Sequence, residues 1–268
     1  MASFSVVTNI ASVNAQANLY ATNIGLRQAL TRVSSGFRIN NSGDDAAGLA
    51  VANAYRSQVA ITTQGIRNAN DGLSTLQIKD GALDNISRLL DRMAVLATQA
   101  ASASFTGSRD TLNNEFQDVI AEIDREAAVA GLTTGGGFSV FVSSEATAAN
   151  GIVSGTITAV TTAGLGLTGD LTTAENAQAA LTTLATAIST LGTVQGEVGQ
   201  IQNRLSYAIS LAQSQIVNTK AAESRIRDAN IAEESANLTR YSILNQSGIA
   251  ALAQANQQTA SVLALLRQ

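Results

Sequence analysis

Apolar residues recur with heptad spacing at both ends of the chain, and this pattern limits the fold more than any other feature. Such spacing is typical of a coiled-coil seam, which needs a partner helix to cover it. The first stripe consists of Val6, Ile10, Val13, Ala17, Tyr20 and Ile24. The second stripe consists of Leu238, Tyr241, Asn245, Gly248, Leu252, Ala255, Thr259, Val262 and Leu266.

Each stripe is narrow, and polar residues cover the rest of its segment, so neither segment can bury its own apolar side chains alone. We therefore expect the two ends to pack on each other and then on copies of the same chain. Ordering the backbone costs about 1–2 kcal/mol per residue, so we expect the ends to fold fully only during assembly. Asn245 and Thr259 would fix the register, and Gly248 would allow close approach. The pattern alone leaves an ordinary amphipathic helix in a monomeric core open.

Composition excludes most enzyme classes. The 268 residues include no Cys, His, Trp or Pro, which removes thiol nucleophiles, imidazole bases and Cys or His zinc sites. We expect no enzymatic activity, catalytic residues, metal or cofactor; an Asp- and Glu-based enzyme with a bound metal stays the alternative. Adjacent Asp44 and Asp45 are more typical of a helix cap than of a metal pair.

Charge and hydropathy limit the partners. The net charge of −4 argues against nucleic-acid binding. The sequence has no run of 18 or more apolar residues, which argues against membrane insertion. Met1–Asn9 lacks the charged and apolar regions of a conventional signal peptide, so none is expected.

The absence of Pro permits long helices, because an interior Pro costs a helix about 3 kcal/mol. We expect a first helix that ends in a loop over 34–45, a second helix from about Ala46, a third helix that ends near Gly131, and a long helix after Leu171. The second helix has the register Leu76, Leu83, Ile86, Leu90, Met93 and Ala97, and the third has Leu112, Phe116, Val119 and Ile123. The long helix has Leu181, Leu184, Ile188, Leu191, Val194, Val198, Ile201, Leu205 and Ala208.

Residues 131–169 differ in kind, because they hold nine of the 21 glycines and are rich in Val, Ile, Thr and Phe. Strands over Phe138–Val142 and Ile152–Val160 would flank a tight turn at Asn150-Gly151. The predicted fold is mainly α: an elongated helical rod with coiled-coil terminal helices and a small β-hairpin region at about 131–170.

Several ordered motifs resemble the bacterial flagellins. They are Ser12-Val13-Asn14-Ala15-Gln16, the run from Ala29 to Asn40, Asp44-Asp45-Ala46-Ala47-Gly48-Leu49-Ala50, the run from Glu223 to Glu234, Asn237-Leu238-Thr239-Arg240 and Ala253-Gln254-Ala255-Asn256-Gln257. The resemblance implies a motility protein: a secreted structural subunit that self-assembles with other flagellin subunits into the extracellular helical filament of the flagellum. It implies an inner coiled-coil domain of 1–44 with 228–268 and a rod domain of 45–227, as in a minimal flagellin without large outer domains. A hook-filament junction protein with similar terminal helices stays the alternative.

The family resemblance also implies partners. They are a flagellar export chaperone, the secretion apparatus, which exports the subunit without a cleaved signal peptide, and the hook-associated and cap proteins. A host innate receptor that detects this family would face Leu90, Arg92 and Glu115. Ala94 and Val95 replace the family's Arg-Glu pair, so we expect weak recognition.

Overall fold

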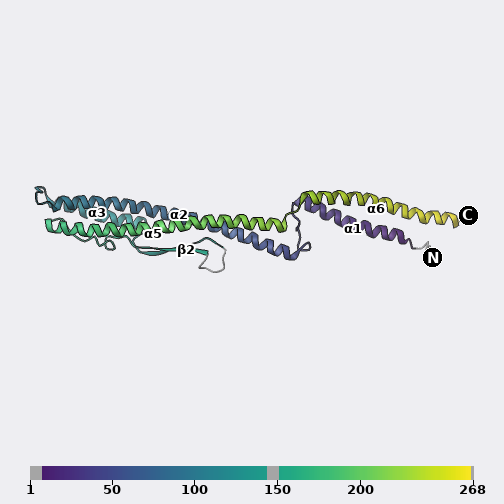
Figure 1. Ribbon diagram of the computed structural model, residues 1–268, viewed down its shortest axis with the longest axis horizontal. Coiled ribbons are helices and arrows are strands. Elements are labelled where there is room, and N and C mark those ends of the chain that lie inside the picture. Colours follow the sequence, from purple (N-terminus) through teal and green to yellow (C-terminus); the bar gives the residue numbers. More distant parts are fainter. Residues whose placement is uncertain (1–7, 144–150, 267–268) are drawn as a thin grey trace. The chain divides into compact units, whose positions relative to one another are not determined.

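The computed structural model describes residues 8–143 and 151–266, with side chains described as far as residue 257 in the last helix. The described chain is mainly α-helical with one small antiparallel hairpin, which confirms the predicted class (Figure 1). The helices are α1 (Ile10–Ser35), α2 (Ala46–Ala101), α3 (Arg109–Val129), α5 (Ala174–Arg227) and α6 (Ile231–Leu266), and the strands are β1 (Gly136–Phe141) and β2 (Ile152–Ile157).

The chain forms two compact units. One combines 1–57 with 219–268, and the other comprises 58–218. Helices α2 and α5 each contribute residues to both units. The division at residues 44 and 228 stays a prediction.

The loop between α1 and α2 is fixed by the two adjacent aspartates. Asp45 Oδ1 accepts a hydrogen bond of 2.8 Å from the backbone N–H of Gly48, so this carboxylate caps the start of α2. Asp44 Oδ2 accepts bonds of 3.0 Å from the backbone N–H groups of Asn41 and Asn40. These two bonds favour the charged carboxylate and hold the pKa of Asp44 below its ordinary value. The pair therefore has a structural role.

The unit of 58–218 is built around one apolar core shared by α2, α3 and α5. The register predicted for α2, from Leu76 to Ala97, is buried as expected. In α5 the buried positions keep a heptad spacing, and they include Leu184, Ala187 and Leu191. Ile188, a member of the predicted helical spacing, lies outside the core, because its side chain is 40% exposed. Ala187 occupies the buried heptad position instead. Its side chain is small and therefore gives only a weak apolar signal in the sequence.

The hairpin packs closely on the helices through glycines. Strands β1 and β2 are antiparallel, with Phe141 opposite Ile152. A Cβ added to Gly72 of α2 would lie 2.8 Å from a methyl group of Val140, so only glycine permits this approach. The register pairs Phe141 with Ile152, so residues 142–151 connect the strands, a longer connection than the predicted tight turn at Asn150-Gly151; Asn150 itself lies outside the described residues.

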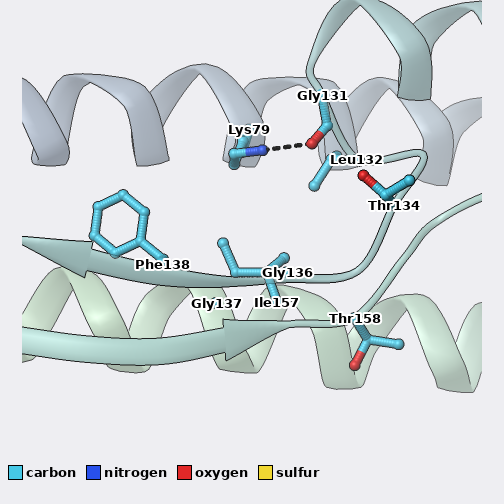
Figure 2. Close-up of a pocket in the computed structure, with 9 residues that line it drawn as sticks. All are labelled: Lys79, Gly131, Leu132, Thr134, Gly136, Gly137, Phe138, Ile157 and Thr158. Carbon is cyan, nitrogen blue, oxygen red and sulfur yellow. Dashed lines mark hydrogen bonds between the residues drawn. The ribbon is translucent and has the colours of Figure 1, made fainter.

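Lys79 of α2 closes the end of α3. Its Nζ donates to the carbonyl oxygen of Gly131 at 2.8 Å, as Figure 2 shows, and to that of Ala130 at 3.0 Å. A positive charge at a helix C-terminus is favourable because the last carbonyl groups have no partner within the helix. Burial lowers the pKa of Lys79. The hollow of about 190 Å³ beside this amine, under the hairpin, therefore lies where α2, the end of α3 and the hairpin meet.

Candidate self-assembly surface

Helices α1 and α6 form an antiparallel pair within the unit of 1–57 and 219–268 (Figure 1). Three contacts between side chains and their partners define the direction. Arg32 pairs with Glu234 at 3.0 Å, Asn245 Nδ2 donates to Asn23 Oδ1 at 2.8 Å, and Asn9 Nδ2 donates to the carbonyl oxygen of Ala255 at 2.8 Å. The two ends of the chain therefore pack on each other.

The C-terminal stripe faces α1. Its members from Leu238 to Leu252 are half-buried, and Ala255 is buried. The ring of Tyr241 lies where a Cβ on Gly25 would be, at 2.6 Å, and Leu19 Cδ1 would lie 3.0 Å from a Cβ on Gly248. The side chains of Thr259, Val262 and Leu266 lie outside the described residues.

The N-terminal stripe faces away from α6. Ile10 is 65% exposed, Val13 55%, Tyr20 71% and Ile24 51%, and Ala17 is exposed with them. We call these five residues the outer ridge. The expectation that this stripe covers the C-terminal stripe is wrong, and Val6 lies outside the described residues. A second heptad of α1 takes its place and consists of Ser12, Ala15, Leu19, Thr22, Leu26, Ala29 and Val33, all buried or half-buried.

Side-chain size explains which face of α1 meets α6. The second heptad is rich in small residues, and with Gly25 beside it the α1 backbone can approach the large side chains of α6. Packing of ridges into grooves rewards this combination of large and small. The outer ridge, with Ile10, Val13, Tyr20 and Ile24, therefore does not pack on α6.

The distribution of charged residues in the sequence also marks this surface. Residues 1–26 and 241–266 contain no Asp, Glu, Lys or Arg. The first charged residue is Arg27, and between Arg240 and Arg267 there is none, so the charge-free segments coincide with the part of the pair that carries the outer ridge. Solvent-facing helix surfaces usually carry charges, so an uncharged exposed face with Ile, Val and Tyr is typical of an interaction site.

Polar contacts hold together the segments that enter and leave the helix pair. The backbone N–H of Arg38 donates to Arg227 O at 2.7 Å, and that of Ala229 donates to Gly36 O at 2.9 Å. The Arg227 guanidinium lies 4.2 Å from the centroid of the Phe37 ring. Part of the mixed-charge run of 223–234 thus makes contacts inside the chain.

The residues expected to face a receptor do not form one exposed surface. Leu90 is fully buried in the core of 58–218. Arg92 Nε donates to Glu115 Oε1 at 2.8 Å, and both side chains are about half exposed. The structure therefore brings Arg92 and Glu115 together as an ion pair and separates Leu90 from the surface.

The part of the chain that the structure describes meets the requirements of neither a metal site nor a membrane-spanning helix. No group of three or more His, Cys, Asp or Glu there could hold a metal ion. Among the same residues, no helix has the length and hydropathy needed to span a bilayer.

Comparison with known proteins gives full-length similarities. The pattern of the bacterial flagellin N-terminal helical region matches residues 6–144, and that of the flagellin C-terminal helical region matches 177–266. A flagellin of Halalkalibacterium halodurans is 35% identical over 97% of this chain and 98% of its own length. The flagellar filament 33 kDa core protein of Treponema phagedenis is 35% identical with the same coverage. A crystal structure of Bacillus cereus flagellin is 30% identical and covers 59% of this chain and 94% of its own, with a TM-score of 0.48.

Proposed function

Because the chain belongs to the bacterial flagellin family and is therefore a subunit of the flagellar filament, we propose that neighbouring subunits pack on the outer ridge of α1. The exposure of Ile10, Val13, Tyr20 and Ile24, on a helix whose other face already packs on α6, carries this proposal. Surfaces of this kind mark sites of protein association. We extend the polymerisation surface to Val6 and to Thr259, Val262 and Leu266 on the basis of the heptad pattern.

Burial of the outer ridge supplies part of the driving force. Full burial of a Val or Ile side chain contributes about 1.5–3 kcal/mol. Ile10, Val13 and Ile24 are between 51 and 65% exposed, so a neighbour can add roughly half of that gain at each residue. A filament repeats the contact in every subunit, so a modest gain per copy stabilises the polymer.

We infer the remaining partners from the family. A flagellar export chaperone would deliver the subunit to the secretion apparatus, which would export it outside the cell without a cleaved signal peptide. Hook-associated and cap proteins would meet the two ends of the filament. The lack of His and Cys supports a purely structural subunit.

We also propose that a host innate receptor, if it contacts this subunit, touches Arg92 and Glu115 and binds weakly. These two side chains are exposed, whereas Leu90 is buried. They already pair with each other, so a receptor must compete with that pair. Ala94 and Val95 add no charge beside them.

The outer ridge is tested by changing Tyr20 to Asp and, as a matched control, to Phe. Tyr20 is 71% exposed, so neither change should alter thermal unfolding of the monomer. Tyr20→Asp would bury an unpaired charge in the polymer, so we expect the critical concentration for polymerisation to rise by more than about tenfold. Tyr20→Phe should polymerise like the parent chain. Sedimentation with electron microscopy measures both, and normal filaments from Tyr20→Asp would exclude the outer ridge as an interface.

A further inference from the structure

A groove of about 490 Å³ lies between α1 and α6, on a different side of α1 from the outer ridge. It is lined by Ala11, Asn14, Ala15, Asn18, Leu19 and Thr22 of α1 and by Leu244, Ser247, Gly248 and Ala251 of α6. One water takes up about 30 Å³ of liquid, so the groove has room for side chains rather than for isolated waters. We call it the α1–α6 groove.

The groove is open because its lining side chains are small. Ala15, Gly248 and Ala251 contribute at most a methyl group each, and Leu19 and Leu244 supply the larger apolar surface. Leu244 is 45% exposed. Asn14, Asn18 and Ser247 add amides and a hydroxyl, and no lining residue is charged. An uncharged, partly apolar groove fits an uncharged helix better than a charged peptide or an ionic ligand.

We propose that the α1–α6 groove receives the outer ridge of a second copy of this chain. The proposal rests on the proposed function, because filament subunits are packed against other copies. The charge-free segments 1–26 and 241–266 carry both surfaces, so no like charges oppose their contact. Helices usually associate by packing the side-chain ridges of one into the surface grooves of another.

The two surfaces also match in length. The α1 residues that line the groove run from Ala11 to Thr22, and the outer ridge runs from Ile10 to Ile24. At about 1.5 Å per residue these segments span roughly 17 and 21 Å. The groove can therefore cover most of the length of the ridge.

The proposed contact explains why assembly does not stop at a dimer. The ridge and the groove are different surfaces of the same molecule, so a copy that fills the groove of its neighbour still offers its own groove to the next copy. Such a head-to-tail contact continues as an open helical polymer unless its rotation closes a ring.

Disulfide trapping tests the contact, because the natural chain contains no Cys. One variant carries Ala17→Cys in the outer ridge, and a second, longer by a tag, carries Ser247→Cys in the groove. Both changes are small, and each chain has one thiol, so a crosslink of mixed length must join two subunits. The control replaces Ser247→Cys with Ser235→Cys, which changes an exposed serine of α6 outside the groove.

In mixed polymers, we expect mild oxidation to yield at least five times more mixed dimer with Ser247→Cys than with Ser235→Cys. In the unpolymerised fraction, we expect the two variants to give equal yields of mixed dimer. Normal polymers with equal yields would overturn the groove contact and leave the proposed function intact. Failure of the unsubstituted chain to polymerise would overturn both. As a second test, Ala251→Leu should fill the groove, leave monomer unfolding unchanged and reduce the pelleted fraction by at least half; full pelleting would contradict the contact.

Discussion

Asn23 and Asn245 set the register of the α1–α6 pair. Their side chains are half-buried and share a hydrogen bond of 2.8 Å. If one helix slid along the other by a turn, both amides would lose this partner, at a cost of about 1–3 kcal/mol for each buried polar group left unsatisfied. Polar pairs in helical seams favour one register at some expense of stability.

The pair predicts a non-additive result in unfolding experiments. Asn245→Leu should destabilise the monomer by about 1–2 kcal/mol, because it leaves the Asn23 amide without its partner. The double substitution Asn23→Leu with Asn245→Leu should recover at least half of that loss, since no amide remains unpaired. A double-mutant cycle from denaturant unfolding measures the coupling. Strictly additive effects would show that the hydrogen bond does not hold the register.

At the scale of elements, α2 stays continuous through Gly65, Gly72 and Gly81, although glycine weakens helices. The first two lie under the hairpin. A Cβ on Gly65 would lie only 2.0 Å from the carbonyl oxygen of Val142, whereas a Cβ on Gly81 would meet no atom within 4 Å. Glycine at position 65 therefore weakens the helix but allows the hairpin to pack closely on α2. Glycine at position 81 weakens the helix without permitting such a contact.

Substitution by alanine should separate these two glycines. Gly65→Ala should lower the free energy of unfolding by about 1–3 kcal/mol, because backbone must move to admit the methyl group. Gly81→Ala should raise it by about 0.5–1 kcal/mol through helix propensity alone. Thermal or urea unfolding of the monomer gives both values. Similar effects of the two changes would contradict the close contact between hairpin and helix.

Local sequence signals predicted the helices well. It was harder to predict which faces of the helices and strands pack on each other. The start of α2 at Ala46 follows from the adjacent aspartates, because a helix cap depends on neighbouring residues. The length of the hairpin connection was harder to predict, because the strands also pack on helices far away in sequence, as the contacts of Gly72 and Gly155 show. The outward face of α1 was mispredicted because the size of the α6 side chains decides which heptad packs inward.

At the scale of the whole molecule, the two units differ in how much they bury by themselves. The core cluster shared by α2, α3 and α5 lies within 58–218. Among the largest fully buried side chains of the described residues, Ile39 belongs to the unit of 1–57 and 219–268, whereas the others belong to 58–218. The terminal unit thus has little internal core and an uncharged exposed ridge, so its stability should depend on neighbouring subunits.

Hydrogen exchange of the monomer and the polymer tests this dependence most directly. Backbone amides of residues 10–26 and 241–257 should exchange fast in the dilute monomer and become at least 100-fold slower in the polymer, because burial against other copies suppresses local opening. Amides of α2 and α5 within 58–218 should be protected in both states and serve as the internal control. Terminal helices already as protected in the monomer as in the polymer would contradict the account.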